Sequence, residues 1–554
     1  MTHPPVSSGS TARRRWVDAA ALIALLAIAL CLLQQQGMGS RETGPSGKDF
    51  SSHPDEAAHV VTGLMVADYA VSGLPAGVKP MAFAEEYYDR LPRVALGHYP
   101  PMYYVLEGAW LAVWRSPAAA LVLPALIGAF WAWVIYLIGK PLIGSRVGSC
   151  AAAVTVLLLP AVQRDVLGIV MSDGLLAVVC LLAVRSLAGY FKTGAVRPSL
   201  AFGSWAAVAG LTKGSGFLLA LVPPVAIALL GDWRRLKDWR LWISAVPVAL
   251  TAVPWTVWTR KMSEEGMRGT TRSEHLREAV PFYAGVLVEV FGWILLTLTA
   301  VAVIRFLWKR LRGAERPSPE VACLISLPVA TLALYLATPI GLEVRYMLPV
   351  APIVLLAALP LVELAAGFGW STRKSGAVAG GVLLAAVAAE KVRPVSVSGY
   401  GYNRAASVVM GDRGGEAPGP PTDVLISSDA PGEGAFIAAV AFQESPQGVV
   451  RVLRSSKVLS TSDWMARGYR QTYPDNASLL RFLTSGRIGW ILTDSAASPR
   501  HRKPHHDQLD AVLAENPAVF PKLDAQPVAR PDGRHGTVTI HRVVPGPAAP
   551  LTPP

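Results

Sequence analysis

A short acidic segment near residue 55 combines residue types that can do chemistry. It reads Pro54-Asp55-Glu56-Ala57-Ala58-His59, and on a helix the side chains of Asp55 and His59 share one face because they are four residues apart. A carboxylate in such polar company can deprotonate a hydroxyl group as a general base. The plainer interpretation is that Asp55 caps the helix and Glu56 favours its first turn. The segment does not match the HExxH pattern of zinc proteases, because Asp55 stands where the first histidine would be.

Four further segments combine acids, cations and aromatic residues. They are His98-Tyr99-Pro100-Pro101-Met102-Tyr103-Tyr104, the pair Arg164 and Asp173, Thr212-Lys213-Gly214, and Glu343-Val344-Arg345-Tyr346. Cations of this kind hold a phosphate, and a nearby carboxylate deprotonates an acceptor, which is what transfer from an anionic lipid-linked donor requires. Each segment also has a structural alternative: the cations would snorkel at helix ends, Asp173 would cap a helix, and the tyrosines would form an interfacial belt.

The elements that must position these residues are apolar helices. The chain has 554 residues, of which only 16% are charged, whereas a soluble protein carries about 25%. Lipid is therefore part of its solvent. The net charge of +13 falls in short clusters between apolar runs and not on one basic face, which argues against nucleic acid as a partner.

Apolar runs of about 20 residues predict eleven membrane-spanning helices. They lie near residues 16–35, 118–139, 147–161, 172–191, 198–212, 215–230, 240–258, 282–304, 319–338, 345–365 and 375–390. Arg13-Arg14-Arg15 and the apolar run behind it resemble a secretory signal, but no small-x-small cleavage site follows. We therefore expect the first helix to be retained.

Basic residues predict the orientation of these helices. With the N-terminus in the cytoplasm, every short basic loop falls on the cytoplasmic side, as the positive-inside rule requires. These residues are Lys140, Arg146, Lys192, Arg197, Arg234, Arg235, Lys237, Arg240, Arg305, Lys309, Arg310, Arg312, Arg316, Arg373 and Lys374. Residues 36–117, residues 259–281 and the tail from 391 then lie outside. Within the first of these, Asp55 to Val71 and Tyr99 to Trp114 are amphipathic, and we expect both to lie along the outer interface.

The tail predicts a soluble α/β domain outside the membrane. Pro and Gly are frequent around 412–421, and His501, His505 and His506 suggest a solvated loop rather than a metal site. Strand-like runs lie at Val424–Ser428, Val449–Leu453, Ile488–Thr493 and Thr537–Val543, and helical patterns at Ala477–Thr484 and His506–Glu515. The chain thus divides into a cytoplasmic N-terminus (1–15), a transmembrane catalytic domain (16–390, with the outer loop 36–117) and an extracytoplasmic domain (391–554).

Five motifs occur in the order found in a known superfamily: PDEAAH after the first helix, HYPPMYY, VMSDGLL, GLTKGSG and LEVRYMLPVAP. Over roughly residues 15–370 the chain resembles the GT-C membrane glycosyltransferases, in the branch that holds protein O-mannosyltransferases and lipid A aminoarabinose transferases. The resemblance implies a polytopic α-helical protein of the bacterial inner membrane with an outward-facing active site. It also implies a polyprenyl-phosphate-sugar donor, displacement with inversion, and a lipid phosphate that leaves. The tail beyond 391 resembles no family.

The resemblance also implies residue roles, carried over by position. Asp55 is the catalytic base with Glu56 in support, and Asp173 is the second acid of the pocket. Lys213 and Arg345 bind the donor phosphate with Tyr346 beside them, and His98 and Tyr99 line the pocket. His59 and Arg164, on the same side of the membrane, complete the substrate-binding candidates. No motif requires a cofactor; a divalent metal stays open, and Asp55, Glu56 and Asp173 would then bind it.

The expected function is transfer of a sugar from a polyprenyl-phosphate-linked donor to a cell-envelope acceptor, which is a lipid, a glycan or a protein. Two alternatives stay open. A transporter or flippase of a lipid-linked intermediate would favour internal repeats and broken helices at mid-membrane, whereas no repeat is found and the polar residues lie at one face. In a non-catalytic scaffold the tail would be the working part. An enzyme predicts that Asp55, Asp173 and Arg345 converge.

Overall fold

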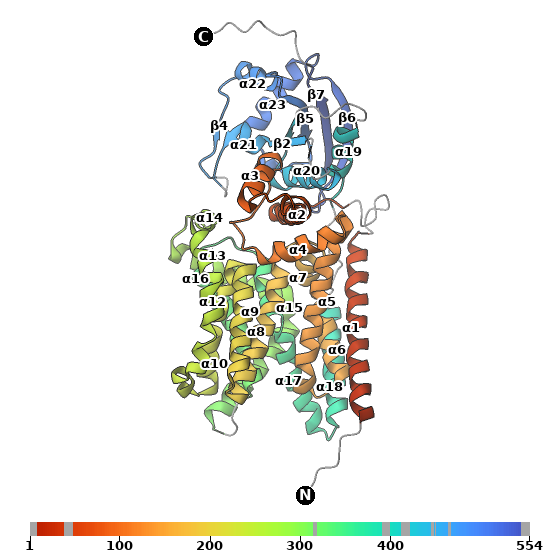
Figure 1. Ribbon diagram of the computed structural model, residues 1–554. Coiled ribbons are helices and arrows are strands. Elements are labelled where there is room, and N and C mark those ends of the chain that lie inside the picture. Colours follow the sequence, from red (N-terminus) through yellow and green to blue (C-terminus); the bar gives the residue numbers. More distant parts are fainter. Residues whose placement is uncertain are drawn as a thin grey trace.

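The computed structural model describes residues 8–37, 48–313, 318–390, 399–411, 422–444, 448, 450–463 and 467–544. The fold has two parts, a bundle of long helices and a sheet domain, with three short helices between them (Figure 1). The backbone of the bundle is satisfied within helices, as lipid demands. The predicted class is therefore confirmed: the protein is a polytopic α-helical membrane protein with a C-terminal α/β domain.

All eleven predicted membrane segments are helical. They are α1 (Ser8–Gly37), α5 (Pro117–Ile143), α6 (Arg146–Leu158) with α7 (Pro160–Val162) and η3 (Gln163–Leu167), α8 (Asp173–Thr193), α9 (Val196–Thr212), η4 (Gly214–Ala220) with α10 (Val222–Leu230), α11 (Trp239–Trp242) with α12 (Ala245–Leu250) and α13 (Ala252–Trp258), α15 (Arg272–Leu311), α16 (Pro319–Ala337), η6 (Val344–Val350) with α17 (Ile353–Gly367), and α18 (Thr372–Ala389). The intervening turns hold η5 (Trp233–Lys237) and α14 (Arg260–Glu265).

Fewer of these segments than eleven are long and apolar enough to cross a membrane. In the described part of the chain there are six such helices, or eight if each of two bent pairs is one span. The bends measure 63° between α6 and the α7–η3 segment and 47° between η6 and α17. The other three predicted segments, α9, η4–α10 and α18, are short or carry charges in their first turn, as α18 does at Arg373 and Lys374.

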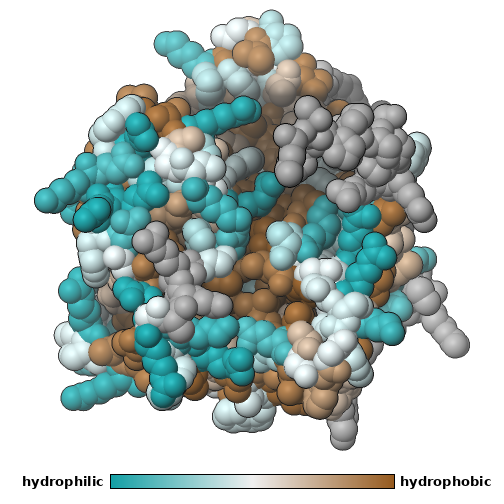
Figure 2. Space-filling view, turned by 90° about the horizontal axis from the view of Figure 1, so that it is seen from below, coloured by the Kyte–Doolittle hydropathy of each residue, from teal (hydrophilic) through white to brown (hydrophobic). Residues whose placement is uncertain are grey.

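The basic loops gather at one end of the bundle, opposite the sheet domain. The turns from α5 to α6, from α8 to α9 and from α17 to α18 all lie at the lower end in Figure 1. Figure 2 shows this end face, where hydrophilic side chains surround a hollow that is lined by apolar ones. The helices therefore alternate in direction as the sequence predicted.

Three helices lie between the bundle and the sheet domain: α2 (Pro54–Asp68), α3 (Pro80–Arg90) and α4 (Met102–Val113), with η2 (Tyr69–Gly73) ending α2. The two predicted amphipathic stretches are thus confirmed as helices. α2 begins with Pro54 at its first position, where the missing N–H costs nothing. Its N-cap is His53, whose Nδ1 accepts a hydrogen bond from the backbone N–H of Asp55 at 3.1 Å. Capping by Asp55 is therefore wrong, and its carboxylate is available for other partners.

The C-terminal domain is a mixed sheet with helices on both faces. Its elements are α19 (Tyr402–Gly411), β1 (Thr422–Ser427), α20 (Ala430–Gln443), β2 (Val450–Arg454), α21 (Ser455–Val458), β3 (Ser460–Thr461), β4 (Arg470–Gln471), α22 (Asn476–Leu483), β5 (Ile488–Asp494), η7 (Pro499–His501), α23 (Pro504–Glu515), β6 (Lys522–Ala529) and β7 (His535–Arg542). The main sheet has the order β2-β1-β5-β7-β6, with β1 parallel to β2 and β5, and β7 antiparallel to β5 and β6.

Most of the predicted elements of this domain are present. The four predicted strands correspond to β1, β2, β5 and β7, and the two predicted helices to α22 and α23. The helices α19 and α20, the strand β6 and the short elements α21, β3, β4 and η7 were not predicted. His505 and His506 are buried at the start of α23, so the expected solvated loop is wrong for both. The boundary at Lys391 and the Pro- and Gly-rich stretch 412–421 lie outside the described residues.

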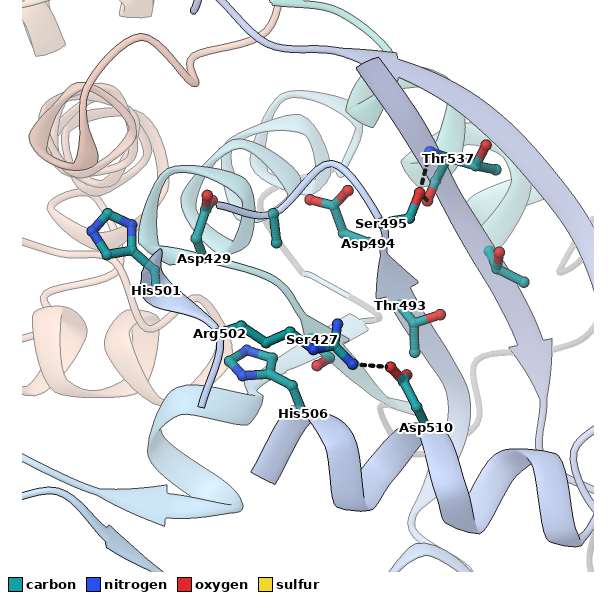
Figure 3. Close-up of a pocket in the computed structure, with 12 residues that line it drawn as sticks. Ser427, Asp429, Thr493, Asp494, Ser495, His501, Arg502, His506, Asp510 and Thr537 are labelled. Atoms are coloured by element: carbon teal, nitrogen blue, oxygen red, sulfur yellow. Dashed lines mark hydrogen bonds and ion pairs between the residues drawn. The ribbon is translucent and has the colours of Figure 1, made fainter. Parts of the chain in front are cut away.

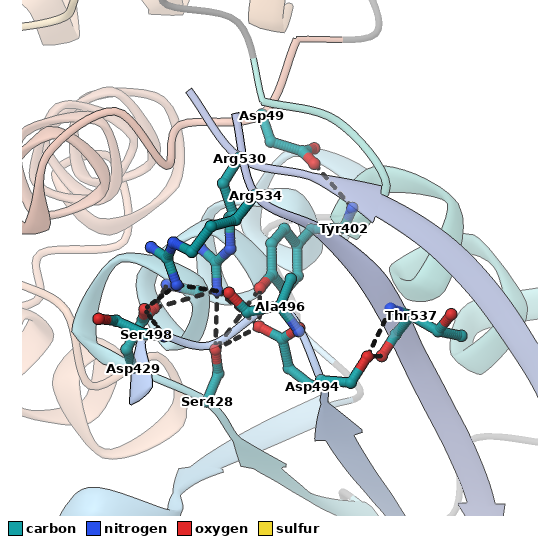
Figure 4. A network of polar contacts seen from close by, with 12 residues as sticks. Asp49, Tyr402, Ser428, Asp429, Asp494, Ala496, Ser498, Arg530, Arg534 and Thr537 are labelled. Carbon is teal, nitrogen blue, oxygen red and sulfur yellow. Dashed lines mark hydrogen bonds and ion pairs between the residues drawn. The ribbon is translucent and has the colours of Figure 1, made fainter. Parts of the chain in front are cut away.

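The sheet domain is attached to the outer helices by buried polar contacts. Asp49 accepts hydrogen bonds from the backbone N–H groups of Tyr402 (2.7 Å) and Asn403 (3.1 Å), and Arg90 pairs with Glu444 at 3.0 Å. Next to Tyr402, Arg530 bridges Asp429 and Asp494 inside the domain (Figure 4). Because these partners lie far apart in sequence, the contacts fix the domain against α2 and α3.

Candidate active site

Asp55 lies in the first turn of α2 and meets two donors from other segments. Its Oδ2 accepts a hydrogen bond from the Tyr99 hydroxyl at 2.8 Å and another from Nη2 of Arg345 at 3.1 Å. His53 completes this surrounding, with Nδ1 3.5 Å from the same oxygen. The chain that precedes α4 and the η6 turn thus converge on the start of α2.

A second carboxylate lies on the other side of Arg345. Asp173, at the start of α8, accepts a hydrogen bond from Nζ of Lys213 at 2.6 Å. Nε of Arg345 lies 3.9 Å from Oδ2 of Asp173, too far for a hydrogen bond. Both atoms are buried and have no hydrogen-bond partner among the described residues. Nε of Arg345 is therefore a donor that is available to a substrate oxygen.

Aromatic rings close the cluster. Lys213 Nζ lies 4.6 Å from the centre of the Tyr346 ring, which suits a cation–π contact, and Tyr346 stacks on Tyr335 at 4.6 Å. The centre of the His59 ring lies 4.8 Å from that of the Tyr99 ring. Tyr99 therefore contacts both Asp55 and His59, the two residues that were predicted to share one face of the helix.

The cluster is electrically balanced and largely shielded from water. Two carboxylates, Asp55 and Asp173, meet two cations, Lys213 and Arg345, and the four side chains are 17%, 3%, 10% and 6% exposed. Burial alone would raise the pKa of the Asp55 carboxyl, but the charge of Arg345 and the hydrogen bond from Tyr99 help to hold that pKa well below its usual value. Asp55 is therefore a carboxylate.

His59 is neutral in this surrounding. Burial lowers the pKa of its imidazole to about 3, although Asp55 favours the charged form. Its Nδ1 has no hydrogen-bond partner among the described residues, and neither have the nearby side chains of Tyr103, Tyr104 and Glu107. His59 thus borders the cluster as an uncharged ring with a free hydrogen-bonding atom.

Three predicted site residues do not join the cluster. Glu56 accepts hydrogen bonds from the backbone N–H groups of Ser52 (2.9 Å) and Val170 (3.4 Å), and its burial raises its pKa. Glu56 therefore ties the start of α2 to the chain before α8. His98 is held by the backbone of Met262. Arg164 pairs with Asp165 at 3.0 Å and with Glu289 at 3.7 Å.

His53 and Met171 were not predicted as site residues, and Glu343 was named only as part of its segment. His53 links Asp55 to Glu343, whose Oε1 lies 3.5 Å from Nε2 of His53, and Met171 accepts a hydrogen bond from Arg345 at 3.2 Å. His53 directly precedes PDEAAH, and Met171 and Glu343 lie inside the quoted motifs. Proximity to a candidate was the only signal that could have identified them.

The three acids considered as metal ligands do not form a ligand set. Asp55 and Asp173 are each paired with a cation, and Glu56 is turned toward backbone N–H groups. Among the described residues, no group of three His, Cys, Asp or Glu side chains is arranged to hold a metal ion. The arrangement instead offers two buried cations and two carboxylates that pair with them.

Comparison with known proteins identifies the fold. No protein-family model matches the chain, and no curated protein matches its sequence. Among solved structures, the chain is similar to ArnT from Cupriavidus metallidurans bound to undecaprenyl phosphate, with a TM-score of 0.54, 14% identity, and coverage of 93% of this chain and 97% of that one. The apo state of the same protein gives a TM-score of 0.56 and 14% identity, and covers 95% and 98%.

This likeness confirms the GT-C-like fold that the motifs implied. It also extends further than the sequence resemblance. Coverage of 93% to 95% of the chain includes much of the C-terminal domain, whereas the motifs ended near residue 370. The tail is thus part of the shared fold, although its sequence carried no recognisable motif.

Proposed function

We propose that the protein is a glycosyltransferase that moves a sugar from a polyprenyl-phosphate-linked donor to a cell-envelope acceptor. The observation that carries the proposal is the buried cluster of Asp55, Asp173, Lys213 and Arg345, since unsatisfied ionic groups at the edge of a membrane bundle are costly and mark functional sites. The ArnT structure with bound undecaprenyl phosphate supports the class of donor.

The two cations would bind the donor phosphate. A phosphate oxygen would accept a hydrogen bond from Nε of Arg345, which has no partner among the described residues, and Lys213, the second cation, lies on the other side of the Asp173 carboxylate. Charge-assisted hydrogen bonds of this kind stabilise the negative charge that develops on the leaving phosphate. Asp173 would keep both cations aligned before the donor arrives.

Asp55 would act as the general base. The acceptor hydroxyl oxygen attacks the anomeric carbon and forms the new glycosidic bond, while its proton passes to Asp55. The bond from the anomeric carbon to the phosphate oxygen breaks, and polyprenyl phosphate leaves with the electron pair. A single displacement of this kind inverts the anomeric configuration.

Donor binding would also expose the base. In the present arrangement Oδ2 of Asp55 is held by Arg345 and Tyr99, so its affinity for a proton is low. A phosphate that competes for Arg345 weakens this pairing and raises the basicity of Asp55. The base would therefore become active only after the donor is in place, which limits wasteful reaction with water.

The orientation of the chain is part of the proposal. The basic loops at the lower end of the bundle (Figure 1) favour a cytoplasmic location for that end, by the positive-inside rule. The N-terminus would then be cytoplasmic in a multi-pass inner-membrane protein. The cluster, the outer loop and the C-terminal domain would be extracytoplasmic, and residues 16–390 would form the catalytic unit.

Sugar transfer in isolated membranes tests the proposal. Membranes that contain the wild type, Asp55→Asn or Asp89→Asn receive radiolabelled polyprenyl-phosphate-hexoses, and label in envelope material is counted. Asp89 is a matched control because it is exposed on α3 on the same side. We expect Asp55→Asn to lose transfer by about 100- to 10,000-fold at equal abundance, and Asp89→Asn to retain it. Equal transfer by all three membranes with every donor would exclude the enzyme and favour lipid transport.

A further inference from the structure

The C-terminal sheet has a topological switch point between β1 and β5. The chain passes from β1 through α20 to β2 on one side of β1, and later returns to β5 on the other side. α20 packs with Val424 and Ile426 on one face of the sheet, whereas α22 and α23 pack with Leu425 and Ile491 on the opposite face. In sheets wound in this way, ligands bind in the crevice outside the carboxyl ends of the strands at the switch point.

A cavity of about 110 Å³ lies at this place. Figure 3 shows it between the ends of β1 and β5 and the start of α23, with Ser427, Thr493 and Asp494 on the strands and Arg502 and Asp510 opposite. A space of this size is well above the minimum of about 10–15 Å³ that one water molecule requires. It suits one small polar ligand and is too small for a lipid chain.

A row of hydroxyl groups crosses the floor of the cavity. Ser427 pairs in register with Thr493, and Thr493 with Thr539, so three neighbouring strands present hydroxyls at one level and on one face. Two residues earlier on the first two strands, the same face is apolar, at Leu425 and Ile491. None of the three hydroxyls makes a side-chain hydrogen bond among the described residues. Their hydrogen-bonding capacity is therefore available to a ligand.

The cations around the cavity are already paired, and carboxylates outnumber them because Arg502 also pairs with Asp507. Asp494 and Asp429 both pair with Arg530, at 2.5 and 3.0 Å, and Arg502 pairs with Asp510 at 2.6 Å (Figures 3 and 4). Asp429 also caps α20 by accepting the backbone N–H of Gly432, so the helix terminus that would attract an anion holds a carboxylate of the protein itself. A phosphate would find no free cation among these groups.

We propose that this cavity binds one uncharged sugar unit. The hydroxyls of Ser427, Thr493 and Thr539 can each donate and accept, and the Arg502–Asp510 pair adds a donor and an acceptor opposite them. This mixture of donors and acceptors matches the vicinal hydroxyls of a pyranose ring. The site shares no residue with the Asp55 cluster, so it stands or falls independently of the transfer reaction.

Ligand-observed NMR on the full-length protein in lipid nanodiscs tests this site. Saturation-transfer spectra are recorded with glucose, galactose, mannose and N-acetylglucosamine, each alone, and with inorganic phosphate as competitor. We expect at least one sugar to bind and phosphate to leave its signal unchanged. The combined variant Ser427→Ala, Thr493→Val and Thr539→Val should weaken binding about ten-fold or more, because it removes three hydrogen-bonding groups. Thr472→Val, an exposed threonine outside the cavity, should not.

Three results would overturn the proposal: no binding of any of the four sugars to the wild type, unchanged binding in the combined variant, or displacement of the sugar by phosphate. The last result would indicate an anion site instead. Thermal unfolding verifies that the combined variant is folded. If it unfolds early, Thr493→Val alone replaces it, since this change is nearly isosteric and breaks no hydrogen bond among the described residues.

Discussion

At the scale of single residues, the site depends on one guanidinium shared by two carboxylates. Arg345 donates to Asp55 at 3.1 Å and lies 3.9 Å from Asp173, so it can move toward either one or toward an incoming anion with small displacements. A buried ion pair adds little net stability because desolvation offsets the attraction. We infer that this pairing is retained for its ability to exchange partners when the donor phosphate arrives.

The charge state of the free site predicts its pH dependence. Because the pKa of Asp55 is lowered, the base form is present at all pH values above its ordinary range, and His59 with a pKa of about 3 stays neutral there. We expect kcat/KM for the donor, which reports ionisations of the free enzyme, to show no acid limb between about pH 5 and 7. A limb near pH 6.5 in initial-rate measurements would mean that an ordinary histidine controls the reaction.

At the scale of elements, the site residues lie where helices begin or end. Asp55 opens α2, Asp173 opens α8, Lys213 ends α9, and Arg345 lies in the η6 turn before α17. Ionisable groups at the ends of apolar runs are readable in a sequence, so these four positions could be predicted as one polar face. The direction of each side chain could not, because neighbours on a helix point about 100° apart and tertiary contacts decide which one faces the site. Glu56 and Asp55 are such neighbours.

The unpredicted elements have physical reasons of the same kind. α20 is buried at every position from Gly432 to Ala441, so it lacks the polar face that makes a helix recognisable. β6 is an edge strand that contains Pro527 and has no clear alternation of apolar residues. The bends after α6 and η6 each divide one apolar run into two shorter helical segments. From composition alone, each run would be counted as one complete membrane span.

The close crossing of α2 and α4 leaves no room for a larger side chain at one glycine, Gly108. A Cβ atom at Gly108 would lie 2.8 Å from Cβ of Val66 on α2, whereas one at Gly285 in α15 would meet nothing within 4 Å. We expect Gly108→Ala to lower stability by about 1–3 kcal/mol through overpacking and to reduce transfer, because α2 carries Asp55. Gly285→Ala, the matched control, should leave both unchanged or raise stability. Thermal unfolding in detergent and transfer assays compare the two, and equal effects would contradict the close crossing.

At the scale of the whole molecule, α2 is held between the bundle and the sheet domain (Figure 1). The domain contacts the outer helices through Arg90 and Glu444 and through Asp49. Because the domain fixes the helix that carries Asp55, its attachment affects the geometry of the site. The alternating direction of the predicted spans placed the outer loop and the C-terminal domain on the same side of the membrane, so their proximity could be predicted from the sequence. The docking contacts could not, because they join residues more than 350 positions apart.

Asp49 makes this attachment sensitive to pH. Burial raises its pKa to about 7, although two backbone N–H donors oppose the shift. The folded state binds a proton on the Asp49 carboxyl more tightly than the unfolded state does. The free energy of unfolding therefore falls as the pH rises from about 4 to about 7. The full shift corresponds to about 4 kcal/mol at most.

Thermal unfolding of the full-length protein from pH 4.5 to 8 measures this effect. Asp49→Asn cannot ionise, so we expect the difference in unfolding temperature, wild type minus Asp49→Asn, to decrease up to about pH 7 and then level off. The control Asp89→Asn should give a difference that does not change with pH. A constant difference for Asp49→Asn as well would show that this carboxyl is not perturbed in the folded protein.

The central claim is that Asp55 is the base and that Lys213 and Arg345 bind the donor phosphate. A single-turnover experiment on purified protein loaded with polyprenyl-phosphate-sugar separates these two roles. The account predicts that Asp55→Asn binds the donor at least as tightly as the wild type, because the carboxylate that competes for Arg345 is removed, but transfers the sugar about 100- to 10,000-fold more slowly. Transfer by Asp55→Asn at the wild-type rate would contradict it.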